Sequence, residues 1–177
     1  MRKCLVVVSL AAFTASPLLA QPNLSAGDRT AAFQAAGFKL KGGQWQACGD
    51  PGTATYAPGA LDAVRDLNGD GRPEAVISEG SLFCFGGTEV GYSIVSKQQD
   101  GSWRQVTSGA GIPNFLATKG VAGWPDIEVG GPGFCFPVER WNGKAYALHR
   151  HEYEGKACRP QKEESVPDPI PALSAQR

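Results

Sequence analysis

The densest group of oxygen-bearing side chains lies in one short stretch, Asp-Leu-Asn-Gly-Asp-Gly-Arg-Pro-Glu, at residues 66–74. Counted from Asp66, side-chain oxygens fall at the first, third, fifth and ninth positions, on Asp66, Asn68, Asp70 and Glu74. A calcium ion takes about six to eight oxygen ligands, and such a loop adds a backbone carbonyl near the seventh position, here that of Arg72. The two glycines of the stretch let the backbone curl without steric penalty. The spacing predicts a calcium-binding loop, and an empty Asx-type turn is the alternative.

The flanks of this stretch distinguish it from an EF-hand. Ile77 stands where an EF-hand needs a bidentate glutamate, and the neighbouring residues alternate as strands do. With its flanking strands, "DLNGDGRPEAVI" resembles the FG-GAP/VCBS calcium-loop repeats. The stretch "GWPDIEVGGPGFCFPVERWNG" and the N-terminal arrangement are similar to those of small exported bacterial proteins that carry such a loop. The resemblance implies no catalytic residue. It implies calcium coordination by Asp66, Asn68, Asp70, the carbonyl of Arg72, and Glu74.

An internal repeat places a second copy of this unit roughly fifty residues later. Gly-x-Pro-acid precedes a strand and then Phe-Cys-Phe in both residues 71–85 and residues 123–136. In the second copy Thr118, Gly120 and Ala122 replace the first three oxygen-bearing residues, and only Asp126 matches Glu74. We therefore expect one ion. Two copies cannot close a propeller, which needs about four or more blades, so the duplicated β units should form one antiparallel sheet or a small sandwich.

The elements around the loop predict a mainly β fold with one N-terminal helix. Residues 24–38 predict a helix with Ser25 as its N-cap and Gly37 at its end. Alternating β-branched and polar residues predict strands at 44–48, 60–65, 74–79, 90–97, 103–107, 125–129, 134–141 and 145–150. The stretch 112–120 is ambiguous, with one helical turn as the expectation.

The cysteines predict covalent cross-links. Beyond the first twenty residues there are Cys48, Cys84, Cys135 and Cys158, without any C-x-x-C pair that would favour a zinc ribbon. An even number in an exported chain predicts two disulfides. Sequence alone leaves three connectivities open; the pairing Cys48–Cys84 with Cys135–Cys158 closes the shorter loops.

Other side chains offer less for a site. His149 and His151 share one face of a strand, but they are the only histidines and have no evident third ligand. Two of Glu79, Glu89 and Glu128 would suit a glycosidase if they lay about 5–9 Å apart, for example Glu79 with Glu128, although carboxylates on strands usually face solvent. Ser81, in "EGSLFCFGG", lacks the G-x-S-x-G elbow of a nucleophilic serine. The stretch "SEGSLFCFGG" (78–87) is the candidate projecting loop of an inhibitor. The four tryptophans are expected in packing roles.

The chain start and the composition predict export. Residues 1–20 have the basic start, the short apolar run and the small residue at Ala20 of a cleaved signal peptide. That apolar run is too short to span a membrane, and no later stretch approaches the length needed. Residues 21–158 are expected to form a single β-rich domain, and the proline-rich residues 159–177 to be disordered. Of 17 basic residues, 15 remain after Arg2 and Lys3 are removed, against 17 acidic ones; this balance gives no reason to expect nucleic acid as a partner.

Together these features predict a periplasmic or extracellular, non-enzymatic β domain with two disulfides and one structural calcium ion. Its role would be that of a binding or interaction module at the cell envelope, with an unidentified protein or envelope component as partner. An envelope hydrolase, or a secreted inhibitor of one, is the alternative.

Overall fold

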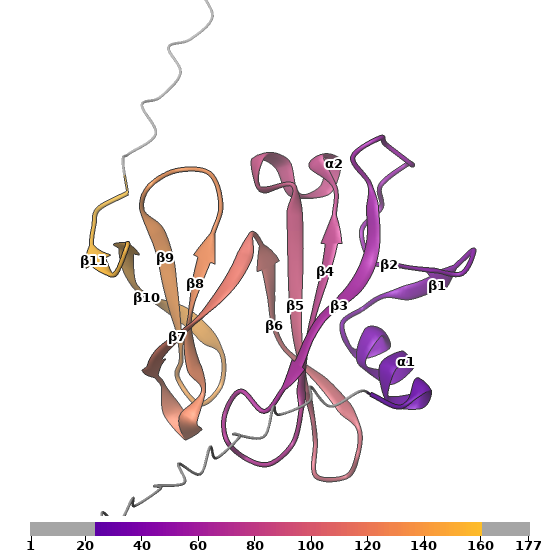
Figure 1. The fold of residues 1–177 in the computed structure, drawn as a ribbon, viewed down its shortest axis with the longest axis horizontal. Coiled ribbons are helices and arrows are strands. Elements are labelled where there is room, and N and C mark those ends of the chain that lie inside the picture. Colours follow the sequence, from indigo (N-terminus) through magenta and orange to yellow (C-terminus); the bar gives the residue numbers. More distant parts are fainter. Residues whose placement is uncertain (1–23, 161–177) are drawn as a thin grey trace, which may run out of the picture.

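The β region forms two large antiparallel sheets and a separate two-stranded hairpin in the computed structural model, which describes residues 24–160 (Figure 1). The four-stranded sheet has the order β3-β4-β5-β6, with β3 at Ala57–Arg65, β4 at Glu74–Gly80, β5 at Val90–Lys97 and β6 at Trp103–Ala110. The five-stranded sheet has the order β11-β10-β9-β8-β7, with β7 at Ile112–Lys119, β8 at Pro125–Gly130, β9 at Phe136–Trp141, β10 at Tyr146–Tyr153 and β11 at Lys156–Ala157. The predicted mainly β fold is confirmed. The expected signal peptide and all but the first two residues of the expected tail lie outside the described residues.

The N-terminal helix predicted from the sequence is present as α1, Ala26–Ala35. The Ser25 hydroxyl caps it by accepting a hydrogen bond from the Asp28 amide at 3.0 Å, and Gly37 with φ of 85° follows its end. The Asp28 carboxylate then accepts hydrogen bonds from the Lys97 ammonium and the Trp103 indole, both at 3.0 Å. These bonds fix α1 against the four-stranded sheet, and with them the pKa of Asp28 falls to about 2. Within residues 24–160, no helix has the length and apolarity to cross a membrane.

The smaller elements connect these parts. A hairpin of β1, Lys39–Lys41, and β2, Gln44–Gln46, follows α1. Between β4 and β5 lie the one-turn helix α2, Leu82–Phe85, and the 3-10 turn η1, Gly86–Thr88. A second 3-10 turn, η2, covers Val121–Gly123 between β7 and β8.

The duplicated unit seen in the sequence is repeated in three dimensions. Each copy is a meander of four consecutive antiparallel strands, β3 to β6 and β7 to β10. Gly71 and Gly123 precede the second strand of their copies with left-handed φ values of 82° and 77°. The acid that follows, Glu74 or Asp126, is fully buried in both copies. The two copies therefore share a left-handed glycine before the second strand and a buried carboxylate after it, whereas the rest of the turn differs, with Gly69 left-handed in the first copy and Ala122 in the second.

Two hydrophobic clusters arrange these elements in layers. The first lies between α1 and the outer face of the four-stranded sheet and includes Phe33, Ile77 and Trp103. The second joins the facing sides of the two sheets through Val76, Ile94 and Ile127, so helix, four-stranded sheet and five-stranded sheet follow one another across the molecule (Figure 1). Three tryptophans are buried as expected, Trp103, Trp124 and Trp141, and Trp45 stacks on Phe33 with ring centroids 4.8 Å apart.

The helical turn expected within residues 112–120 is wrong, because this segment is strand β7. Its residues pair with β8 from Ile112 opposite Gly130 to Phe115 opposite Ile127. A neighbouring strand with unpaired backbone groups decides the conformation of a segment whose local pattern is ambiguous. Two other strands are shorter than predicted, since β2 ends at Gln46 and β9 begins at Phe136.

Candidate functional site

The predicted calcium loop connects β3 to β4 and folds its first acid inward. The Asp66 carboxylate accepts hydrogen bonds from the amides of Gly69 at 2.7 Å, Asp70 at 3.1 Å and Gly71 at 2.8 Å. Gly69 and Gly71 both have left-handed φ values of 82°, which a residue with a Cβ adopts only with strain. The loop thus holds its curl through one carboxylate and two glycines.

The middle of the loop is also held by its own side chains. The Asn68 side-chain carbonyl accepts from the Asp70 amide at 3.0 Å, and its amino group donates to the Asp70 carboxylate at 3.1 Å. Asp70 further accepts from the Arg72 amide at 2.9 Å and forms an ion pair with the Arg72 guanidinium. Arg72 also donates through Nε to the Lys97 carbonyl at 3.1 Å, which ties the loop to the end of β5.

Among the predicted calcium ligands, Glu74 is the one that is buried. Its carboxylate has no solvent exposure and accepts two hydrogen bonds of 2.7 Å, from the Leu67 amide and the Ser96 hydroxyl. Burial, followed by the negative charges of Asp70 and Asp66, raises the pKa of Glu74 above its usual value. Within residues 24–160, no lysine, arginine or histidine forms an ion pair with Glu74. Its charge is therefore buried beside two like charges without a cation.

Asp126 occupies the same position in the second copy with opposite surroundings. It is equally buried, but Arg140 donates to both of its oxygens at 2.8 Å, and Arg150 donates to Oδ2 at 2.8 Å. The Thr118 hydroxyl, which stands where the first copy has Asp66, donates at 2.6 Å. Bonding to Arg140 above all holds the pKa of Asp126 well below its usual range. Arginine side chains supply here the positive charge that Glu74 lacks.

The two turns are in direct contact. The backbone carbonyl of Asn68 lies against Gly123, so close that a side chain on this glycine would overlap with it. Behind the turns, the Tyr146 hydroxyl donates to the Pro125 carbonyl at 2.9 Å. Burial raises the pKa of Tyr146, and the charges of Asp126 and Glu74 add to that effect. The buried acids of the two copies therefore act on one shared tyrosine.

The loop's donor set suits a hard cation by its chemistry. Asp66, Asn68, Asp70 and Glu74 supply oxygens alone, and a carboxylate has about four lone-pair positions. The Glu74 carboxylate makes two hydrogen bonds, so lone pairs remain on it. As folded here, the other carboxylates bond the loop's own backbone, and the described residues contain no group of three or more His, Cys, Asp and Glu side chains arranged to hold a metal ion. Filling the site therefore requires Asp66 and Asp70 to exchange hydrogen bonds for metal ligation.

The cysteines are paired as the shorter-loop connectivity predicts. Cys48 is bonded to Cys84 and Cys135 to Cys158, with Cα atoms 6.3 and 5.8 Å apart. These two cross-links indicate an oxidising compartment. The first one fastens the segment after β2 to α2, and the second fastens the start of β9 to the end of the described chain.

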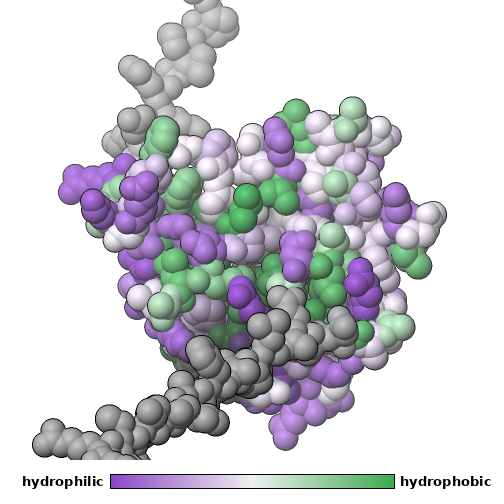
Figure 2. Space-filling view, viewed as in Figure 1, coloured by the Kyte–Doolittle hydropathy of each residue, from purple (hydrophilic) through white to green (hydrophobic). Residues whose placement is uncertain are grey.

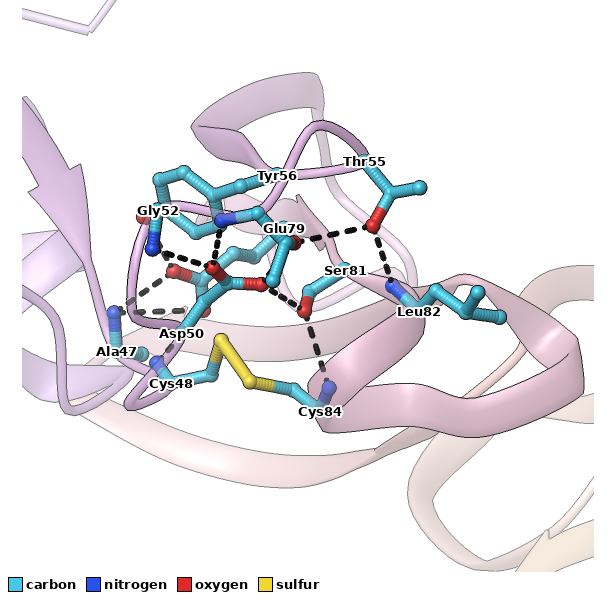
Figure 3. The surroundings of a disulfide bond; sticks show 11 residues. Ala47, Cys48, Asp50, Gly52, Thr55, Tyr56, Glu79, Ser81, Leu82 and Cys84 are labelled. Carbon is cyan, nitrogen blue, oxygen red and sulfur yellow. Dashed lines mark hydrogen bonds between the residues drawn. A yellow bond between two sulfur atoms is a disulfide. The ribbon is translucent and has the colours of Figure 1, made fainter.

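Around the Cys48–Cys84 disulfide lies a polar cluster that the sequence did not predict (Figure 3). Glu79 accepts from the amides of Ala47 at 3.1 Å and Cys48 at 2.9 Å, and from the Tyr56 hydroxyl at 2.9 Å. Asp50 accepts from the Ser81 hydroxyl, and Ser81 in turn accepts from the Cys84 amide at 3.0 Å. Burial, then bonding to Glu79, raises the pKa of Tyr56 to about 12. Burial raises the pKa of Asp50 as well, but its hydrogen bonds from Ser81 and Thr53 outweigh that effect and bring it to about 2.

The remaining candidates are not assembled into a site. Glu79 lies on β4 and Glu128 on β8, in different sheets, and Glu128 is not among the residues that line the pocket beside Glu79. Glu128 accepts instead from the Asn114 side-chain amide at 3.3 Å. On β10, His149 is exposed and His151 half-buried. A glycosidase pair of Glu79 and Glu128 has no support in this geometry.

Sequence reasoning missed the two arginines that neutralise Asp126 and the serine that bonds Glu74. Arg140 and Arg150 lie on neighbouring strands, and Ser96 lies on β5, more than twenty residues beyond Glu74. One signal in the sequence could have indicated the arginines. The second copy keeps Asp126 but has lost the two other acids and the asparagine of the loop, so its charge has to be neutralised by a group other than a bound ion. No family model matches the chain, and no curated protein or solved structure is significantly similar to it.

Proposed function

We propose that this chain is a non-enzymatic exported binding module in which one structural calcium ion clamps the loop between β3 and β4. The observation that carries this proposal is the charge on Glu74, which is fully buried and has no cationic partner within the described residues, whereas the matching Asp126 has two. Burying an unpaired charge is costly, and a divalent cation in the adjoining loop would offset that cost.

The residues that would hold the ion are Asp66, Asn68, Asp70, Glu74 and the carbonyl of Arg72. Three carboxylates against a divalent ion leave one net negative charge, which the Arg72 guanidinium beside Asp70 is placed to balance. Calcium takes flexible oxygen coordination and exchanges ligands readily. A bound ion would hold the shape of the loop in place of the hydrogen bonds that Asp66 and Asp70 accept from backbone amides.

The expected stabilisation follows from mass action. Extracellular calcium modules bind with dissociation constants of about 10⁻⁴–10⁻³ M. An ion present at about 100 times its dissociation constant stabilises the folded state by roughly 2.7 kcal/mol. An exported domain that faces abundant calcium can therefore use even a weak site for stability.

Thermal melting tests the clamp. The melting temperature of the wild type is expected to rise in about 10 mM calcium relative to chelator, and Asp70→Ala is expected to lose that rise. Asp100→Ala is the matched control, because Asp100 also closes a turn by accepting from Ser102, but lies in the β5–β6 hairpin. Identical melting curves in calcium and in chelator contradict the proposal.

A second candidate, an inhibitor of an envelope hydrolase, is favoured by the segment between β4 and β5. α2 is anchored by the disulfide and by Ser81, yet Leu82 and Phe83 on it are 47% and 65% exposed. In the view of Figure 2, the upper edge of the molecule, where α2 lies in Figure 1, carries some hydrophobic residues. Rigid exposed apolar side chains are suited to insertion into a partner's cleft.

Inhibition assays with purified envelope hydrolases test this candidate. If the α2 segment is the contact, Phe83→Ser should abolish inhibition while Leu40→Ser, a change of another exposed apolar residue on β1, should leave it intact. Absence of inhibition by the wild type, or equal loss in both variants, contradicts the inhibitor candidate and leaves the calcium clamp unaffected.

A further inference from the structure

A pocket of about 290 Å³ lies on the outer face of the four-stranded sheet, beside the Cys48–Cys84 disulfide. Its walls come from Phe38, from Phe85 of α2 and from the Glu79 region of β4, and its floor includes Ser93 and Ser108 of the paired strands β5 and β6. Its volume is at the lower end of the range of small-molecule sites. The pocket lies near the end of β4, whereas the calcium loop precedes the start of that strand, so the two sites are separate.

Glycine creates part of this space. Gly91 on β5 has no side chain, and the Phe85 ring occupies the position where one would stand. The ring therefore lies directly on the sheet and forms an aromatic wall. Phe38, which also lines the pocket, is seated in the same way over Gly59 of β3.

The pocket floor contains a hydroxyl that is free to bond a ligand. Ser93 is only 8% exposed, and it pairs across the sheet with Ile77 and Ser108. Ile77 belongs to the hydrophobic cluster beneath α1, and cross-strand partners point to the same face, so the Ser93 hydroxyl points into the pocket. Within residues 24–160, no fully enclosed side-chain oxygen lacks a hydrogen-bond partner. The Ser93 hydroxyl makes no hydrogen bond to another described residue. It is therefore not fully enclosed and can be reached from the pocket.

The pocket is also negatively charged. Glu79 is 3% exposed and accepts hydrogen bonds from neutral donors only. Within residues 24–160, neither Glu79 nor the nearby Asp50 takes part in an ion pair. Both charges contribute to the raised pKa of Tyr56, after burial and the Glu79 hydrogen bond. A carboxylate beside two aromatic rings attracts a cation both by charge and through the ring faces.

We propose that this pocket binds a small organic cation, a protonated amine on a compact apolar body. The apolar body packs against Phe38 and Phe85, the ammonium group lies on the Glu79 side, and the Ser93 hydroxyl accepts from it or bonds a polar substituent. The charge of Glu79 disfavours an anionic ligand, and a neutral ligand leaves that charge without a counterion.

Titration with benzylamine, compared with benzyl alcohol, tests this assignment. The two probes have nearly the same shape and differ in charge at neutral pH. Followed by amide chemical shifts in the oxidised protein, benzylamine is expected to bind at least about tenfold more tightly, with shifts confined to the pocket, at Ala47, Ser93 and Ser108. Equal affinity for the two probes, or shifts dispersed over the surface, overturns the proposal.

Two variants separate the charge from the cavity. Glu79→Gln is expected to remove the preference for benzylamine, but it also alters the hydrogen bonds that the Ala47 and Cys48 amides donate, which hold the fold here. Ser108→Phe avoids that difficulty, because it places an aromatic ring from an exposed strand position over the pocket and leaves Glu79 unchanged.

The Ser108→Phe variant should abolish binding of benzylamine. Its matched control is Ala117→Phe, which adds the same ring at an exposed position on β7, in the other sheet, and should leave binding intact. Undiminished binding to a folded Ser108→Phe overturns the assignment.

Discussion

The two copies of the β unit bury the same carboxylate and surround it in opposite ways. In the first copy, Glu74 sits behind a loop with two further acids and is held only by an amide and a hydroxyl. In the second copy, Asp126 sits behind a turn that has lost those acids and is bonded by Arg140 and Arg150. The pKa of the first is raised and that of the second is lowered.

This difference shows that the same position in a repeated unit can bury an acid with very different charges around it. The turn glycines and the position of the acid are common to both copies. What differs, within the described residues, is whether the chain itself supplies a cation to the buried acid. The second copy carries its own in the form of guanidinium groups, and the proposed calcium ion would serve that role in the first.

The largest effect is expected from Asp126→Asn. The substitution keeps the shape of the side chain but removes the charge that both arginines share, in a fully buried position. Breaking a buried ion pair by changing one partner costs about 3 kcal/mol or more, so the urea midpoint should fall clearly, in calcium and in chelator alike. A cost near zero would mean that the arginines contribute little and would weaken the comparison.

A smaller loss is expected from Gly123→Ala, at the contact between the two turns. The left-handed φ of 77° alone strains an alanine, and the added methyl group also overlaps with the Asn68 carbonyl. Backbone strain of this kind costs of order 1–3 kcal/mol, and displacement of Asn68 should weaken calcium binding as well.

Gly101→Ala is the control for that variant, because Gly101 has a φ of 83° but nothing within 4 Å of the position of an added Cβ. It should lower the melting temperature through strain while leaving the calcium-dependent rise unchanged. An equal calcium response in the two variants would show that the turns are not coupled.

Glu74→Gln should have the smallest effect, and one of opposite sign to that of Asp126→Asn. The glutamine carbonyl can accept from the Leu67 amide and its amino group can donate to the Ser96 oxygen. In chelator at neutral pH the variant should match the wild type or exceed it by about 1 kcal/mol, because it removes an uncompensated buried charge.

The stability advantage of Glu74→Gln over the wild type should depend on pH. A raised folded-state pKa means that the penalty of the Glu74 charge appears as pH rises through its ordinary value of 4.5 and is complete above the folded pKa. The advantage of Glu74→Gln should therefore vanish in acid. For Asp126, with its lowered pKa, the stabilisation is present above the ordinary value of 3.8 and is lost as pH falls further. Stability curves against pH that run parallel for the two variants would contradict this account.

Local patterns predicted most of this architecture because they act over short distances. The helix cap at Ser25, the strand alternation, the turn glycines and the repeat of Gly-x-Pro-acid each specify a few neighbouring residues. The shorter-loop rule also gave the disulfide pairing. The strand β7 was missed, since its conformation depends on pairing with β8 rather than on its own sequence.

The electrostatic surroundings could not be predicted in the same way. Arg140 and Arg150 reach Asp126 from strands that follow it in the chain, and no spacing rule joins them to it. The pocket beside Glu79 likewise depends on Phe85 lying over Gly91, a contact made from α2, which is fastened by its disulfide. Charge compensation and cavities are properties of the assembled sheets.

Direct measurement of calcium binding by isothermal titration calorimetry tests the central claim. The wild type is expected to bind one calcium ion per chain with a dissociation constant of about 10⁻⁴–10⁻³ M, and Asp66→Asn to lose that binding while remaining folded. Absence of binding by the folded wild type at millimolar calcium, or equal binding by Asp66→Asn, would contradict the assignment of the ion to the loop between β3 and β4.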